Sequence, residues 1–139
     1  MIAMIKGLRM RRILSIVLVC ICLSACAVSR VAMTNANYGP RPSKTEAMQI
    51  IKQSLERVLI DPDSLRLACA DDIRKGWARD NMYDPPNFGW LINCSVNSKN
   101  SFGGYTGNKN YYFSVNGSSA YPLDVTNPTN INLRMSYVE

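Results

Sequence analysis

Three hydrophobic patterns follow one another along the chain. Residues 13–22 form an apolar run, interrupted only by Ser15, behind a basic start. Residues 43–60 then place apolar side chains at helical spacing, and from residue 65 onward short stretches alternate apolar and polar side chains. One helix followed by several short strands predicts an α+β fold, in which one N-terminal helix packs on a small antiparallel sheet of about four strands.

The predicted helix begins at Ser43 and ends before Pro62. Ser43 and Glu46 fit a capping box, in which each side chain accepts a hydrogen bond from a free amide at the helix start. The apolar stripe consists of Ala47, Met48, Ile51, Leu55, Val58 and Leu59. A helix lying on a membrane surface is the alternative, but the polar face mixes both charge signs, which favours packing on a sheet.

The strongest strand candidate is residues 88–97. Its inward face is predicted to consist of Trp90, Ile92, Cys94 and Val96. Residues 65–70 alternate in the same way, with Leu65, Leu67 and Cys69 inward. Residues 71–87 are polar and contain two prolines near their end, so we expect a long connection in which Ile73 and Trp77 cover the edge of the core.

The rest of the chain predicts a hairpin and a weaker last element. Residues 111–115 and 120–125 are strand candidates joined by the favoured turn pair Asn116-Gly117. Pro122 restricts the second of these strands to an edge of the sheet. Residues 131–137 alternate again, which predicts either a final strand or a frayed tail.

The apolar run near the start indicates an export signal. It is shorter than the roughly 20 apolar residues that cross a bilayer, and it follows four cations, Lys6, Arg9, Arg11 and Arg12, without an intervening acid. Whether Met1, Met4 or Met10 is the start does not alter this pattern.

The run is followed by Leu23-Ser24-Ala25-Cys26, which resembles the lipobox of bacterial lipoproteins. The resemblance implies that residues 1–25 are a signal peptide and that Cys26 becomes the lipid-bearing first residue. The alternative is an ordinary signal peptide whose cleavage site precedes a cysteine. Since Ala27 and not aspartate follows Cys26, we expect attachment to the outer membrane with the domain facing the periplasm; the inner membrane and the cell surface stay open.

The predicted domain organisation follows from this leader. Residues 26–42 lack periodicity and end in Gly39-Pro40-Arg41-Pro42, which predicts a flexible linker behind the lipidated cysteine. In a functional alternative, Tyr38 and the prolines dock a partner. Residues 43–139 then form a single globular α+β domain.

The positive charge belongs mostly to the leader. Of 16 Lys and Arg, four precede the apolar run, so the remaining twelve face ten Asp and Glu, a net charge of +2. No clustered basic face is visible in the sequence, and we expect no nucleic-acid partner.

Two cysteines remain after the leader and the lipid site. Cys69 and Cys94 both fall on predicted inward positions, and we expect them to form a disulfide in an oxidising compartment. Closing this loop of about 26 residues would restrict the unfolded chain by about 3.5 kcal/mol. Two buried free thiols and a redox pair are the alternatives, although no CxxC spacing is present.

Residues 96–107, which read VNSKNSFGGYTG, are unusual for a plain loop. With Asp61-Pro62-Asp63-Ser64 and Cys94, they resemble a group of small bacterial exported proteins and lipoproteins. In that group a DPxS turn follows a helix, and a strand ending in cysteine leads into a VNxKNsfGGYtG loop. The resemblance covers about residues 46–116 and implies no catalytic residue.

This loop is the candidate binding site. Gly103, Gly104 and Gly107 permit positive φ and close approach, and Lys99, Phe102 and Tyr105 lie among them. The ligand would be an anion, a glycan or a protein, for example a host or rival hydrolase whose cleft receives the loop. The structural alternative is a glycine-dependent turn whose Phe102 and Tyr105 pack on the sheet.

The sequence lacks histidine, which excludes Ser-His and Cys-His catalysis and imidazole metal ligands. We expect no cofactor and no metal site. The function that fits best is a non-catalytic binding or accessory module of the cell envelope. The alternative is a hydrolase of wall glycan that uses paired carboxylates, drawn from Asp61/Asp63, Asp71/Asp72 and Asp80/Asp84.

Overall fold

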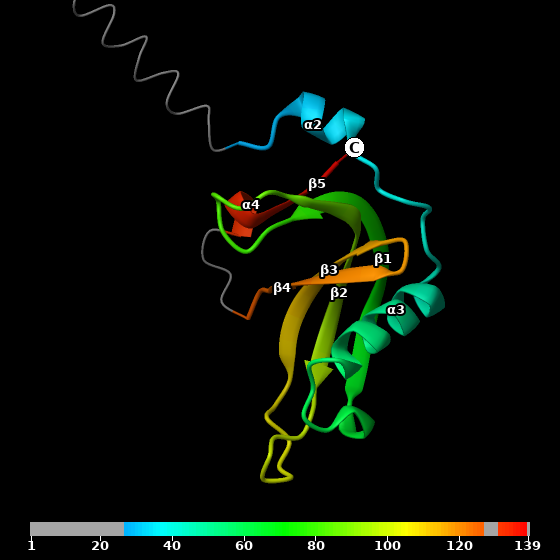
Figure 1. The fold of residues 1–139 in the computed structure, drawn as a ribbon, viewed down its shortest axis with the longest axis vertical. Coiled ribbons are helices and arrows are strands. Elements are labelled where there is room, and N and C mark those ends of the chain that lie inside the picture. Colours follow the sequence, from blue (N-terminus) through cyan, green and yellow to red (C-terminus); the bar gives the residue numbers. More distant parts are fainter. Residues whose placement is uncertain (1–26, 127–130, 139) are drawn as a thin grey trace, which may run out of the picture.

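The computed structural model describes residues 27–126 and 131–138 (Figure 1). The leader and Cys26 lie outside the described residues. Five strands form one curled antiparallel sheet in the order β4-β3-β2-β1-β5. The strands are β1 (Arg66–Ala78), β2 (Asn87–Asn97), β3 (Lys109–Asn116), β4 (Ser119–Asp124) and β5 (Met135–Tyr137). The α+β class and the antiparallel sheet are confirmed, with five strands in place of about four.

Helices occupy the chain before the sheet and just before its last strand. They are α2 (Arg30–Asn35), α3 (Lys44–Glu56), the 3-10 helix η1 (Pro62–Ser64) and α4 (Ile131–Arg134). Among the residues that the structure describes, no helix is long and apolar enough to cross a bilayer.

The start of α3 has the predicted capping box. The Ser43 hydroxyl accepts a hydrogen bond from the Glu46 amide at 3.2 Å, and the Glu46 carboxylate accepts one from the Ser43 amide at 2.8 Å. Ala47 and Ile51 of this helix are fully buried. The helix ends at Glu56, with Arg57 as its C-cap, so Val58 leaves the predicted apolar stripe and is largely exposed.

The core consists of two clusters on opposite faces of the sheet. Ile92, Cys94 and Val96 are buried in the larger one, as the alternation in β2 predicted. The larger cluster also contains Ala47, Ile51, Ile73, Phe113 and Val115. The smaller cluster joins Leu91 to Ala78, Leu123 and Met135. Because neighbouring strand residues point to opposite faces, β2 is buried on both sides.

Strand β1 is longer than predicted. It runs through residues 71–78, which the sequence assigned to a long connection, and the true connection is residues 79–86. The register shifts between Cys69, which pairs with Cys94, and Ile73, which pairs with Ile92. This bulge places the polar residues Asp71 and Asp72 on the surface within a strand, which is why the segment reads as a loop.

The β3–β4 hairpin turns one residue later than predicted. Asn116 pairs with Ser119, so the turn residues are Gly117 and Ser118, and Gly117 takes the positive φ of 57°. The Asn116 amide group instead donates hydrogen bonds to the carbonyls of Asn37 and Phe88. Strand β4 is at the edge of the sheet, in agreement with Pro122.

The last predicted strand is reduced to three residues. Residues 131–134 form α4, and β5 pairs only with the end of β1. Residues 127–130 lie outside the described residues.

Residues 37–42 lie against the sheet, although the sequence predicted a flexible linker as far as residue 42. Tyr38 is 6% exposed, and its ring packs edge-on against Phe88 with centroids 5.6 Å apart. The Trp90 indole N–H donates to the Gly39 carbonyl at 3.1 Å, and the Arg41 guanidinium donates to the Ile73 carbonyl at 3.0 Å. Tyr38 therefore packs within its own domain and is not exposed for a partner to bind.

Candidate binding site

The connection between β2 and β3 forms a projecting arm. Residues 98–107, which we call the hairpin arm, extend beyond the sheet at the end of the molecule opposite α2 and the C-terminal strand (Figure 1). Lys99 and Tyr105 form an antiparallel bridge across it, and the Thr106 amide donates to the Ser98 carbonyl at 3.1 Å. The arm therefore continues the pairing of β2 and β3 in narrower form.

The tip of the arm is closed by its own hydrogen bonds. The Asn100 side-chain oxygen accepts from the amides of Phe102 and Gly104 at 3.0 and 3.1 Å. The Asn100 amide donates to the Gly104 carbonyl, and the Gly103 amide donates to the Asn100 carbonyl. Gly103 has a φ of +80°, a conformation that L side chains rarely adopt. The glycine and the asparagine together give the tip a defined shape.

Phe102 is displayed at this tip. Its side chain is 94% exposed, which contradicts the structural alternative in which Phe102 packs on the sheet. A large apolar ring in water gains nothing for folding, whereas aromatic side chains dominate the energy of many binding interfaces. Phe102 is thus the residue of the arm best placed to insert into a partner.

Tyr105 and two cations form the side of the arm. The Arg66 guanidinium lies 4.0 Å from the centre of the Tyr105 ring, and the Lys99 ammonium lies 5.7 Å from it. Tyr105 remains 40% exposed beside these two cations. The structure brings Lys99 and Tyr105 together across the arm. Gly107 also takes a positive φ, of +91°, whereas Gly104 has none of this kind.

The base of the arm is fixed to η1. The Lys99 amide donates to the Ser64 hydroxyl at 2.9 Å, and that hydroxyl donates to the Asp61 carbonyl at 2.7 Å. Ser64 is buried. The Ser64 hydroxyl therefore links the DPDS turn to the VNSKN loop. These are the two segments that the sequence analysis grouped into one signature.

Two apolar side chains whose exposure the sequence analysis did not predict lie just before η1. Val58 and Ile60 are both largely exposed and belong to the segment that joins α3 to the DPDS turn. Helical periodicity assigned Val58 to the core, and only the end of α3 at Glu56 shows otherwise. They add apolar surface next to the element that holds the arm.

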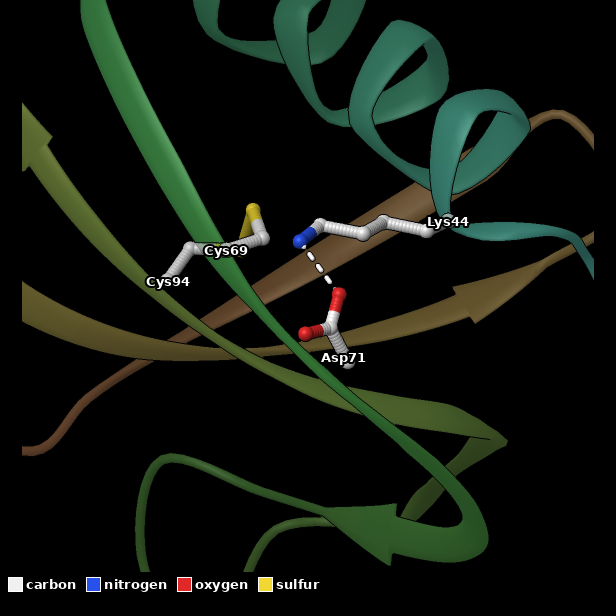
Figure 2. Close-up of a disulfide and its surroundings, with 4 residues drawn as sticks. All are labelled: Lys44, Cys69, Asp71 and Cys94. Carbon is white, nitrogen blue, oxygen red and sulfur yellow. Dashed lines mark hydrogen bonds and ion pairs between the residues drawn. A yellow bond between two sulfur atoms is a disulfide. The ribbon is translucent and has the colours of Figure 1, made fainter.

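The predicted disulfide is confirmed. Cys69 and Cys94 are directly opposite each other on β1 and β2 and are bonded (Figure 2). Cys94 is fully buried and Cys69 partly buried. The bridge joins the central strand β2 to its neighbour β1 where β1 begins its bulge.

Among the candidate carboxylates, Asp71 and Asp72 form separate ion pairs on the surface. Asp71 pairs with Lys44 at 2.6 Å (Figure 2), and Asp72 pairs with Arg74 at 2.8 Å. The hydrogen bond from Lys44 is the main reason that the pKa of Asp71 lies below its usual value. Asp80 and Asp84 both lie close enough to Tyr121 to raise its pKa, and Asp84 also accepts a hydrogen bond from Asn81.

The described residues contain no cluster of three His, Cys, Asp or Glu side chains suited to a metal ion. Comparison of the chain with protein-family models, with curated proteins and with solved structures finds no match. The lipobox and the loop signature therefore stay predictions, and function must be argued from the geometry of the site.

Proposed function

We propose that this protein is a lipid-anchored module of the bacterial envelope that binds a partner protein through its hairpin arm. The observation that carries the proposal is Phe102, 94% exposed at the tip of an arm whose backbone is held by its own hydrogen bonds. A rigid, exposed aromatic anchor loses little conformational entropy on binding, which favours association.

The placement of the arm and of α2 at opposite ends of the molecule supports this function. The arm lies at one end, and the chain enters the domain through α2 at the other (Figure 1). In a lipoprotein anchored at Cys26, with its domain in the periplasm, this arrangement directs Phe102 away from the membrane surface. We also propose attachment to the outer membrane, because Ala27 and not aspartate follows Cys26.

A wall-glycan hydrolase gains no support from the geometry. Such an enzyme needs two carboxyl groups facing each other across a substrate site, one with a raised pKa. Asp71 and Asp72 are instead tied to Lys44 and Arg74, and the pKa of Asp71 is lowered. Asp71 and Asp72 therefore lack the arrangement that such an enzyme needs.

Pull-down from solubilised envelopes tests the binding function. The bait is the intact lipoprotein, compared with Phe102→Ala and with Lys99→Ala/Tyr105→Ala. Tyr83→Ala is the matched control, because Tyr83 is 84% exposed but lies in the β1–β2 connection. We expect one or more proteins that copurify with wild type and with the Tyr83 variant and are lost with the Phe102 variant. Equal recovery by all four proteins would remove the arm from the function.

Metabolic labelling tests the anchor. A clickable palmitate analogue should label the wild-type protein in growing cells, and Cys26→Ser should abolish the label. Density separation of the membranes then assigns the labelled protein to the inner or outer membrane. Labelling that survives Cys26→Ser would contradict the lipid site.

A further inference from the structure

A basic groove lies at the end of the molecule opposite the hairpin arm. It has a volume of about 950 Å³ and is bordered by α2, by the chain before α3, and by β1, β2 and β5. Four cations contribute to its lining, Arg30, Arg41, Arg74 and Lys75, together with the aromatic residues Trp90 and Tyr137. Among the described residues that line it there is no Asp or Glu.

Aromatic faces hold three of these cations in place. Arg41 lies 5.5 Å from the centre of the Trp90 ring, Arg74 lies 3.5 Å from that of Tyr137, and Lys75 lies 4.2 Å from that of Tyr38. The Arg41 guanidinium is also fixed by its bond to the Ile73 carbonyl. Such contacts restrict long side chains before a ligand arrives, which lowers the entropy lost on binding.

The charge of the groove is only partly compensated. Arg74 pairs with Asp72 at 2.8 Å. In the described part of the chain, no carboxylate pairs with Arg30, Arg41 or Lys75. Like charges gathered around one groove repel each other, so an anion bound between them relieves that repulsion. Guanidinium groups match the oxygens of phosphate by paired hydrogen bonds.

We propose that this groove binds the phosphate ester of an anionic phospholipid headgroup. The position along the chain favours a lipid as the source. Arg30 is four residues after Cys26, a length that spans at most about 14 Å. This choice of source rests on the proposed anchor at Cys26, whereas the phosphate chemistry rests on the groove alone. The same site accepts a soluble phosphate ester if no lipid competes.

Titration of the purified full-length protein in a nonionic detergent tests the proposal. The probes are dioctanoyl phosphatidylglycerol, dioctanoyl phosphatidylcholine and glycerol 3-phosphate, followed by calorimetry and by tryptophan fluorescence, since Trp90 lines the groove. The test variant is Arg30→Ala/Lys75→Ala. Arg57→Ala/Lys109→Ala removes the same charge from exposed positions elsewhere and is the control. Thermal unfolding checks that both variants fold.

We expect phosphatidylglycerol to bind the wild-type protein and phosphatidylcholine not to bind. The groove variant should bind phosphatidylglycerol at least about tenfold more weakly, and the control should change by less than about twofold. Glycerol 3-phosphate binding as tightly as phosphatidylglycerol would assign the site to soluble phosphate esters. Equal binding of both lipids, equal losses in both variants, or no binding of any phosphate probe would overturn the proposal.

This outcome is separable from that of the anchor and the arm. Loss of the palmitate label bears only on Cys26, and partner recovery bears only on Phe102. If the native protein proves to carry no lipid at Cys26 while its groove binds phosphate, the phosphate site stands and its assignment to the anchoring membrane is refuted.

Discussion

The backbone amide of Lys99 donates a hydrogen bond to the hydroxyl of Ser64 at 2.9 Å, joining segments 35 residues apart in sequence. The same hydroxyl donates to the Asp61 carbonyl, so Ser64 bridges the 3-10 turn and the first residues of the hairpin arm. This contact joins the DPDS turn of this chain to its VNSKN loop.

Removing the Ser64 hydroxyl should loosen the base of the arm. Ser64→Ala leaves the partly buried Lys99 amide and the Asp61 carbonyl without this partner, at a cost of about 1–2 kcal/mol in the free energy of unfolding. Hydrogen exchange of the Lys99 amide should accelerate more than that of core amides. Ser118→Ala, in an exposed turn, is the control and should change neither quantity. An unchanged Lys99 exchange rate would contradict the bridging role.

The Cys69–Cys94 bridge should contribute substantially to stability. The sequence separation of 25 residues corresponds to about 3.5 kcal/mol of lost entropy in the unfolded chain. Cys69→Ala/Cys94→Ala should therefore lower the free energy of unfolding in urea by about that amount. Thiol labelling of the denatured processed protein without reductant should modify neither cysteine. Labelling of both would show that the bridge does not form in the cell.

Gly76 should tolerate no side chain. A Cβ at this position would lie 2.6 Å from the Ser136 carbonyl oxygen and 2.5 Å from Leu91, in the pairing of β1 with β5. We expect Gly76→Ala to destabilise the protein by about 1–3 kcal/mol and to release β5, which hydrogen exchange of the Val138 amide reports.

Gly104→Ala is the control for this substitution. A Cβ at position 104 would meet only the Asn100 side-chain oxygen, at 3.8 Å. It should change stability by less than about 0.5 kcal/mol. If the two variants were equally stable, close packing at Gly76 would not be a constraint on the fold.

Alkaline pH should destabilise the protein through its half-buried tyrosines. Burial, followed by the hydrogen bond with Tyr112, raises the pKa of Tyr137 from 10.0 to about 12. Because the folded pKa exceeds the unfolded one, this contribution to stability is complete below pH 10 and is lost as the pH rises through about 12. Solvent screening limits the effect to about 1 kcal/mol.

Tyr137→Phe tests this dependence. Urea unfolding on both sides of pH 10 should show that the variant loses less stability than wild type as the pH rises. Tyr83→Phe removes a hydroxyl from a residue that is 84% exposed and should retain the wild-type pH dependence. Identical pH profiles for wild type and Tyr137→Phe would contradict the raised pKa.

Local signals in the sequence were sufficient for several elements. The capping box at Ser43 set the start of α3, and the strict alternation in β2 identified Ile92, Cys94 and Val96 as buried. The inward phase shared by Cys69 and Cys94 led to the correct disulfide. For α3 and β2 the deciding pattern lies within a few residues or within one regular strand, and each cysteine of the disulfide lies on the inward phase of its own strand.

Elements that depend on distant contacts were missed. The bulge after Cys69 breaks the two-residue period of β1. Because the polar residues Asp71 and Asp72 lie at this break, the sequence pattern predicted a loop where the structure has a strand. Residues 37–42 carry no periodicity, and Tyr38 is buried only because Phe88 and Lys75 are beside it. In the same way, the exposure of Phe102 depends on how far the arm projects, which its composition does not encode.

The two candidate binding sites, the basic groove and the hairpin arm, lie at opposite ends of the molecule. The basic groove is adjacent to the segment that leads to Cys26, and the hairpin arm is at the opposite end (Figure 1). We propose that the groove binds lipid phosphates at the end of the domain that carries α2, while Phe102 faces a partner at the other end.

The most direct test of the central claim is photocrosslinking in living cells of the native host. A photoreactive phenylalanine analogue replaces Phe102 in one strain and Tyr83 in another, both positions being highly exposed. We predict a discrete adduct of higher mass from position 102 that is absent from position 83, and that Ser64→Ala weakens. No adduct at position 102, or the same adduct from both positions, would contradict the assignment of the hairpin arm as the binding site.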